Sequence, residues 1–159
     1  MSDVHSKSVR SKNMKAIASH DTAPELIVRR LLYNNGYRYR VAPTYIEGKP
    51  DIWLKKRKTA IFINGCFWHA HECEKFRWPK TNTDFWKRKL LKNKERDERN
   101  IKVLLSQKVR VLIIWECAVS GKKKLTEHTL LMLITVWFQS VEQYAEITSD
   151  GLRVFDGRE

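Results

Sequence analysis

The amino-acid sequence predicts one α/β domain in which helices flank a mixed β-sheet. Helix-like and strand-like segments alternate along the chain and do not separate into blocks, which is typical of this class. One segment, residues 109–115, is almost wholly apolar, as expected for a strand buried on both faces. The chain has 159 residues, of which 42% are hydrophobic, and this is enough for one compact domain with one core.

The first helix is predicted to begin at Thr22, a good N-cap residue. Pro24 lies in the first turn, and Glu25 completes a Thr-x-x-Glu capping box. Apolar residues at helical spacing follow, and Asn34-Asn35-Gly36 is a stop signal. Residues 37–41 then alternate between aromatic or apolar side chains and arginine, which predicts a half-buried strand.

The middle of the chain is predicted to hold a hairpin, a loop and a long helix. Two strands are predicted at residues 51–54 and 59–63, and the charged turn between them would let them pair. Residues 64–77 form an irregular loop rich in cysteine, histidine and aromatic residues. A long helix, very polar in its middle, is predicted over residues 82–107 and leads to the buried strand. A last helix is predicted over residues 125–141, and a weak strand follows it.

Three regions are predicted along the chain. Residues 1–20 are polar and basic, and we expect them to be an arm that orders on a partner. Residues 21–150 are expected to form the single domain, and residues 151–159 a tail.

The formal net charge of +13 predicts a polyanionic partner, because each lysine or arginine set against a phosphate releases counterions. The charge does not separate DNA from RNA, or binding from catalysis. No apolar run is long enough to span a membrane, and the N-terminus lacks the apolar core of a signal peptide. We therefore expect an intracellular protein with no membrane partner.

Three cysteines and a histidine are spaced as ligands of one metal ion could be. Cys66, His71 and Cys73 form the pattern Cys-x4-His-x-Cys, and Cys117 lies at the end of the buried strand. Four such ligands would close a tetrahedral zinc site and tie the loop to the tip of the strand, which would stabilise a small domain. The alternative is three unrelated buried thiols and a loop histidine.

Asp51, His69 and Glu25 each have a catalytic and a plain interpretation. Pro50-Asp51 resembles the first half of the Pro-Asp…(Asp/Glu)-x-Lys signature of Mg²⁺-dependent nucleases, but the second half is missing and Pro-Asp is also a common turn. His69 could be a base that activates water, or a loop histidine with a solvent or backbone partner. Glu25 could reach a metal-bound water, or it could only complete the cap of its helix.

The long predicted helix carries a basic face. Five residues recur along it at three- and four-residue steps: Trp86, Lys89, Asn93, Arg96 and Asn100. Lysine and asparagine on such a face can read base edges, although a solvated surface is the ordinary explanation. Phe67, Trp68 and Trp86 are aromatic residues in polar surroundings. They could stack on bases or wedge between them, or they could pack in the core.

The Cys/His loop reads Gly65-Cys66-Phe67-Trp68-His69, followed by His71 and Cys73. This motif resembles the very short patch repair (Vsr) DNA mismatch endonucleases. Further segments match in the same order: Asp3-Val4-His5, Arg10-Ser11-Lys12-Asn13-Met14, Gly48-Lys49-Pro50-Asp51, Phe85-Trp86, Asn93-Lys94-Glu95-Arg96-Asp97 and Trp115-Glu116-Cys117. The resemblance covers residues 3–125, and the chain beyond residue 130 matches poorly.

The resemblance implies a nuclease fold related to the type II restriction endonucleases. It implies nicking 5′ to the T of a T·G mismatch that arises from deaminated 5-methylcytosine. Catalytic Mg²⁺ would bind Asp51 and the backbone carbonyl of Ile63, with His69 as general base and Glu25 as an assisting acidic group. The implied ligands of a structural zinc ion are Cys66, His71, Cys73 and Cys117.

The resemblance also implies how double-stranded DNA would be held. Phe67, Trp68 and Trp86 would form a wedge beside the mismatch, and Met14 would enter from the minor groove. Two further residues would touch bases: Lys89 and Asn93. We expect a monomer, since an asymmetric mismatch needs no twofold partner. It would act in the cytoplasm at the nucleoid, with repair proteins as further partners.

Two positions depart from the family pattern. Ile63 stands where a well-known family version has threonine, which a backbone-carbonyl ligand would tolerate, and Asn64 stands where histidine is frequent. These departures, with the missing acidic residue and lysine, keep a non-catalytic mismatch-binding module as an alternative. A catalytic zinc hydrolase is a second alternative, but it needs an open ligand position that four ligands would close.

Overall fold

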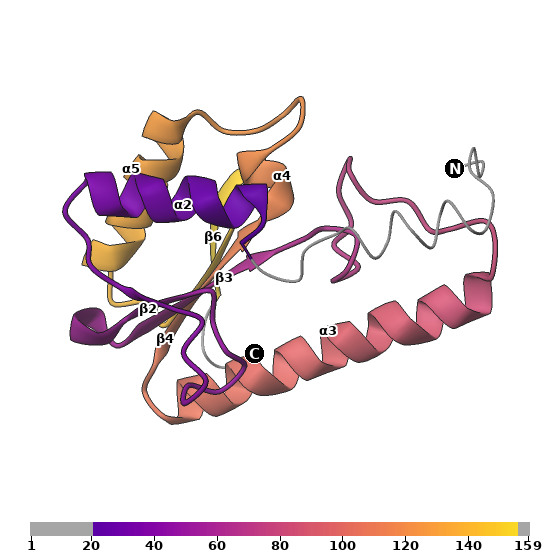
Figure 1. The fold of residues 1–159 in the computed structure, drawn as a ribbon, viewed down its shortest axis with the longest axis horizontal. Helices are drawn as coiled ribbons and strands as arrows, with labels where there is room; N and C mark the ends of the chain where they lie inside the picture. Colours follow the sequence, from indigo (N-terminus) through magenta and orange to yellow (C-terminus); the bar gives the residue numbers. More distant parts are fainter. Residues whose placement is uncertain (1–20, 156–159) are drawn as a thin grey trace.

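The computed structural model of the protein describes residues 21–155, and residues 1–20 and 156–159 lie outside the described part (Figure 1). The arm predicted over residues 1–20, with Met14, therefore falls outside the described residues. No helix within the described part combines the length and apolarity that a membrane span requires.

A six-stranded mixed sheet forms the centre of the domain, in the order β1-β2-β3-β4-β5-β6. The strands are β1 (Arg40–Val41), β2 (Ile52–Leu54), β3 (Thr59–Asn64), β4 (Arg110–Trp115), β5 (Tyr144–Thr148) and β6 (Gly151–Phe155). β3, β4 and β5 run parallel, and the remaining neighbours pair antiparallel. The predicted mixed sheet and the predicted hairpin of β2 and β3 are both confirmed.

Helices cover both faces of the sheet. They are α2 (Ala23–Asn34), α3 (Thr83–Ser106), α4 (Glu116–Val119) and α5 (Glu127–Gln139). α2, α4 and α5 lie on one face and α3 on the other (Figure 1). The buried strand β4 shows how the faces divide, because Leu112 and Ile114 pack toward α2 and α5 while Val111 and Ile113 pack toward α3. This alternation follows from the two-residue period of a strand.

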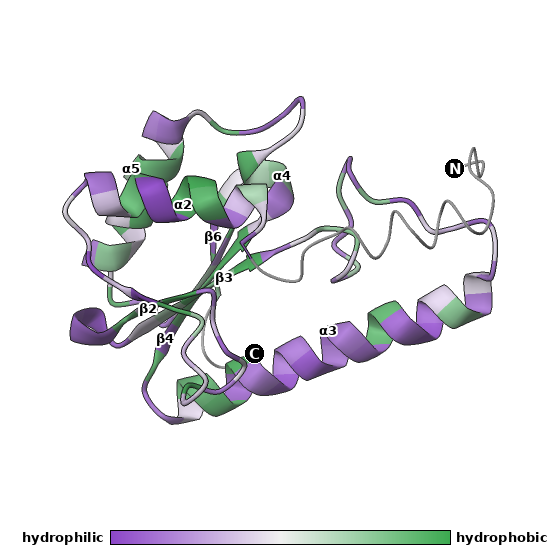
Figure 2. Ribbon diagram, in the orientation of Figure 1, coloured by the Kyte–Doolittle hydropathy of each residue, from purple (hydrophilic) through white to green (hydrophobic). Residues whose placement is uncertain are grey.

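α3 packs at its two ends and is polar between them (Figure 2). Near its C-terminus, Leu104 is buried and packs against the sheet with Ile101 and Leu105. Near its N-terminus, Trp86 and Leu90 are buried in a separate cluster formed with the loop that follows β3. The helix therefore joins the sheet to the Cys/His loop.

Three local predictions differ from the structure. The strand predicted over residues 37–41 is only the two-residue β1, because its partner β2 ends at Leu54 and the chain there turns into the short helix η1 (Lys55–Arg57). Residues 151–155, predicted as tail, form β6, which pairs along its whole length with β5.

The capping box at the start of α2 does not form as predicted. Thr22 is the N-cap residue but makes no side-chain cap hydrogen bond. Its hydroxyl instead donates to Oε1 of Glu25 at 3.2 Å, and Oε2 of Glu25 accepts from the backbone N–H of Asp21 at 2.9 Å. The Glu25 carboxylate is thus held by side chain and backbone just before the helix.

Candidate active site and metal centre

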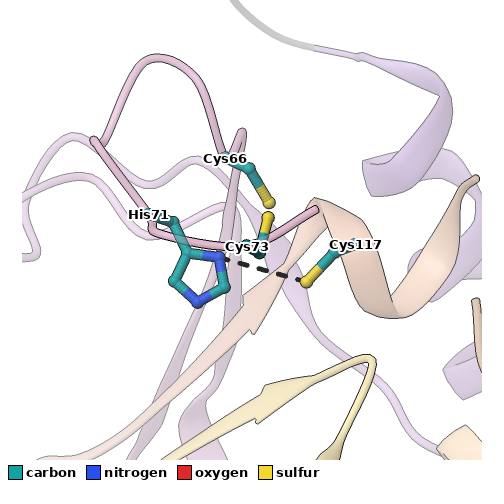
Figure 3. A group of neighbouring side chains, drawn as sticks. All are labelled: Cys66, His71, Cys73 and Cys117. Carbon is teal, nitrogen blue, oxygen red and sulfur yellow. Dashed lines mark hydrogen bonds between the residues drawn. The ribbon is translucent and has the colours of Figure 1, made fainter. Parts of the chain in front are cut away.

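The predicted Cys/His ligands meet in one cluster. The ligand atoms of Cys66, His71, Cys73 and Cys117 all lie within 4.8 Å of one another (Figure 3). Three of them come from the loop after β3, and Cys117 is the second residue of α4, which follows β4 directly. β3 and β4 are parallel neighbours, with Asn64 opposite Trp115, so the two strands deliver all four side chains to one edge of the sheet.

Contacts around this cluster hold its members in place. The His71 ring stacks on the Trp115 indole, with centroids 4.0 Å apart and planes 9° from parallel. The backbone N–H of Cys66 donates to Oε1 of Glu116 at 3.2 Å. Hydrogen bonding between the two buried thiols raises the pKa of Cys66 and lowers the pKa of Cys117. Three sulfurs and one imidazole nitrogen at this spacing fit the tetrahedral shell of a metal ion.

A second group of side chains gathers around Asp51, one residue before β2. The antiparallel register of β2 and β3 places Asp51 beside the end of β3, where its Oδ2 accepts from the backbone N–H of Ile63 at 2.7 Å. The pKa of Asp51 is raised to about 6, chiefly by burial, and the hydrogen bond from Ile63 opposes this shift. The charge of Glu25 raises the pKa further, and those of Arg29 and His69 lower it. Glu25 and His69, the other residues predicted as catalytic, therefore lie within electrostatic reach of Asp51, although the three come from different segments.

Glu25 lies almost completely out of solvent, with 4% of the residue exposed. Besides the contacts from Thr22 and Asp21, its Oε2 accepts from a terminal nitrogen of Arg29 at 3.1 Å. A buried carboxylate is stable only when it is paired and hydrogen-bonded, and these donors satisfy that requirement.

His69 is held by a carboxylate that the sequence interpretation did not assign. Its Nδ1 forms a hydrogen bond with Oδ2 of Asp97, and about a fifth of each side chain is exposed. Asp97 lies on α3, 28 positions along the chain from His69. Among residues 21–155, the hydrogen bond of the His69 ring is made through Nδ1 and not through Nε2. The sequence signal that could have indicated Asp97 is its spacing of four residues from Asn93, which puts both on one face of α3.

The aromatic residues predicted to meet DNA pack against one another. Phe67, Trp68 and Trp86 have ring centroids 5.1–5.9 Å apart. Trp86 is buried, Phe67 and Trp68 are half-buried, and the neighbouring Phe85 is exposed. Lys89 places its ammonium 5.7 Å from the Trp68 ring.

Asn93 is the other residue predicted to touch bases. Its side-chain amide donates to the carbonyl of Trp68 at 3.0 Å and ties α3 to the loop.

Both positions that depart from the family pattern, Ile63 and Asn64, are buried at the end of β3. Their side chains are thus covered, and the contact that Ile63 makes with Asp51 runs through its backbone.

Comparison with known proteins identifies the family. Residues 2–75 match the family described as DNA mismatch endonuclease Vsr. The DNA mismatch endonuclease Vsr of Escherichia coli (strain K12) is 43% identical over 154 residues, which is 97% of this chain and 99% of that protein. The chain belongs to the Vsr DNA mismatch endonuclease family. The predicted resemblance is confirmed, and the chain is an endonuclease of the Vsr family.

Nicking enzymes are also related to this Vsr-family chain. The type II nicking enzyme V.NmeAIP of Neisseria meningitidis is 46% identical over 122 residues, covering 77% of this chain and 87% of that protein. V.XorIIP of Xanthomonas oryzae is 38% identical over 120 residues, covering 76% of this chain and 88% of that protein.

Proposed function

We propose that this Vsr-family chain nicks one strand of double-stranded DNA, 5′ to the T of a T·G mismatch produced by deamination of 5-methylcytosine. Family membership supports mismatch nicking, and the net charge of +13 suits a polyanionic substrate. One observation carries the catalytic part. The charges of Glu25 and His69 both act on the pKa of Asp51, while Asp97 holds the His69 ring.

The proposed role of His69 is that of general base. An imidazole whose Nδ1 is fixed by a carboxylate keeps one tautomer and presents Nε2 to a proton, and the carboxylate stabilises the imidazolium that forms. His69 would take a proton from water as the water oxygen attacks the phosphorus. The bond from phosphorus to the 3′ oxygen breaks, so the products are a 5′-phosphate and a 3′-hydroxyl. His69 would thereby take the role of the lysine that is missing from the nuclease signature.

Asp51 and the backbone carbonyl of Ile63 would hold the catalytic Mg²⁺. The fit rests on charge and donor type: a carboxylate oxygen and a carbonyl oxygen are hard ligands, and Asp51 lies close to a second carboxylate in a half-buried site. When bound, Mg²⁺ would polarise the scissile phosphate and stabilise developing negative charge. Glu25 would assist as an acidic group close to this ligand.

Cys66, His71, Cys73 and Cys117 would hold a structural zinc ion. Thiolate and imidazole are the ligands that zinc prefers, and four of them leave no open position for substrate. The cluster therefore supports a staple between the loop and α4, and it speaks against a catalytic zinc hydrolase. The domain over residues 21–150 would be of the restriction-endonuclease-like type.

The proposed DNA contacts use the aromatic cluster and α3. Phe67, Trp68 and Trp86 would wedge beside the mismatch, which requires the cluster to open because Trp86 is buried. Lys89 and Asn93 would touch bases, and Met14 in the N-terminal arm would enter the minor groove. A monomer would suffice for an asymmetric mismatch. Repair proteins would be further partners at the nucleoid.

Cleavage of end-labelled duplexes tests this proposal. The duplexes carry a single T·G pair in varied flanking sequences, with T·A and U·A duplexes as controls, and each is incubated with and without Mg²⁺. We expect one nick, in the T strand only, and only with Mg²⁺. Binding of the T·G duplex without a nick would support the non-catalytic module instead.

A further inference from the structure

Arg29 is a largely buried cation that contacts Glu25 and acts electrostatically on Asp51. It lies on α2, one turn after Glu25, and only 12% of its side chain is exposed. The adjoining Arg30 is exposed, so the two arginines separate the effect of a buried charge from that of a surface charge.

The Arg29 guanidinium bridges two carboxylates. One terminal nitrogen contacts Oδ1 of Asp21 at 2.6 Å, and the other contacts Oε2 of Glu25 at 3.1 Å. Asp21 adopts a left-handed backbone conformation, with φ of 55°, at the point where residues 1–20 join the domain. The planar fork of arginine can hold two acceptors in a fixed relation, which the single ammonium of lysine cannot do.

The contacts of Arg29 have both a cost and a gain in free energy. The Nε of Arg29 is buried and has no hydrogen-bond partner among residues 21–155, and an unsatisfied buried donor costs stability. Without the guanidinium, however, Glu25 would be an unpaired buried carboxylate close to Asp51. Two such carboxylates repel, so Glu25 would take up a proton or turn away.

We propose that Arg29 is a positioning residue of the nicking reaction: through its contact with Glu25 it holds that carboxylate in place beside the catalytic centre. This inference rests on the proposed function, in which Glu25 assists at that centre. The terminal nitrogens of Arg29 contact Asp21 and Glu25, so the proposed role is exerted on Glu25 and needs no contact with the phosphate. It acts through Glu25.

A double-mutant cycle tests this role. Single-turnover nicking of the T·G duplex is measured with saturating enzyme and Mg²⁺ for five proteins besides the wild type: Arg29→Met, Arg29→Lys, Glu25→Gln, Arg29→Met with Glu25→Gln, and Arg30→Met as control. The dissociation constant for the same duplex is measured without Mg²⁺. Circular dichroism shows whether each variant is folded at the assay temperature.

We expect Arg29→Met to lower the nicking rate constant roughly tenfold or more, with at most about a threefold change in the dissociation constant. In the Glu25→Gln background the same substitution should change the rate less than about twofold, because the group through which Arg29 acts is gone. Arg29→Lys should fall between wild type and Arg29→Met, and Arg30→Met should nick at the wild-type rate.

Equal loss of rate in both backgrounds would show that Arg29 does not act through Glu25 and would overturn the inference. So would a wild-type rate in Arg29→Met. If Arg29→Met does not fold, the cycle is run with Arg29→Lys and the same criterion applies. Failure of the wild-type protein to nick would instead overturn the proposed function, and the positioning role with it.

Discussion

His69 and His71 are two residues apart in the same loop, yet the structure places them in different chemical environments. His71 joins three sulfurs in a closed cluster and stacks on Trp115. His69 pairs with Asp97, and its charge acts on the pKa of Asp51. Soft ligands that fill a shell hold a metal and exclude substrate, whereas oxygen ligands with open positions leave room for phosphate and water. In the proposed function, the first of these centres stabilises the fold and the second reacts.

Trp115 is the contact between the two centres. Its indole stacks on His71 and meets the His69 ring edge-on, with centroids 6.2 Å apart. The indole N–H donates to Oε1 of Glu146 on β5 at 3.2 Å. Because one buried side chain touches both histidines, each centre must be disrupted on its own to learn whether the separation is real.

The largest effect is expected from Cys117→Ser. A structural zinc ion supplies folding free energy outright, so loss of one ligand should release the metal and lower the stability by several kcal/mol. Metal content by atomic spectrometry and thermal unfolding by circular dichroism measure this. His69→Ala is the matched control, since it should keep one metal ion per chain. A Cys117→Ser protein with full metal content and unchanged melting temperature would contradict a structural role.

Asp51→Asn should abolish nicking and leave the fold intact. We expect the rate to fall roughly a thousandfold or more, because the amide is a poor Mg²⁺ ligand and several kcal/mol of charge stabilisation are lost. Asp150→Asn, exposed in the turn before β6, is the control and should nick normally. Substantial Mg²⁺-dependent nicking by Asp51→Asn would remove Asp51 from the reactive centre.

The stability of Asp51→Asn should depend on pH differently from that of the wild type. The pKa of Asp51 is raised from 3.8 to about 6, chiefly by burial, so its folded form prefers the neutral acid. Its contribution to stability is present below pH 4 and is lost as the pH rises through 6. Without Mg²⁺, Asp51→Asn should therefore gain stability relative to wild type between pH 4 and 7, by roughly 3 kcal/mol at most. Urea unfolding across this range checks it, and a constant difference would contradict the buried, ionised carboxylate.

His69→Ala should have a smaller effect on rate than Asp51→Asn. Loss of a general base typically costs roughly a hundred- to ten-thousandfold. Asp97→Asn should cost about tenfold to a hundredfold, because the base remains but its tautomer is no longer fixed. Single-turnover nicking measures both, with the exposed His128→Ala as control. If Asp97→Asn nicks at the wild-type rate, the hydrogen bond between Asp97 and His69 has no part in the reaction.

Local patterns in the sequence predicted much of the fold. The long helix was predicted at residues 82–107 and is Thr83–Ser106, because apolar residues at helical spacing mark both of its ends. The hairpin of β2 and β3 was predicted from two apolar runs and a charged turn. β6 was missed because it is short and only half-buried, and its stability comes from pairing with β5 rather than from its own pattern.

The site was harder to predict, because its contacts join remote segments. The spacing of Cys66, His71 and Cys73 predicted a metal cluster, which the structure assembles with Cys117. The pairing of His69 with Asp97 spans 28 positions, and no local period connects them. Arg29 was overlooked although it lies four residues after Glu25, since an arginine at this spacing usually forms only a surface ion pair.

The smallest effect is expected from Lys89→Met, which tests whether the reactive centre has its own recognition surface. Lys89 lies over the half-buried Trp68 at the N-terminal end of α3. If Lys89 touches bases at the mismatch, Lys89→Met should weaken binding of the T·G duplex by roughly 1 kcal/mol, about fivefold. The variant should bind the T·A duplex almost as tightly as the wild type does. Fluorescence anisotropy with both duplexes measures this, with Lys122→Met in an exposed loop as control. Equal weakening for both duplexes, together with a shallower salt dependence, would identify Lys89 as a phosphate contact and assign discrimination to the aromatic cluster.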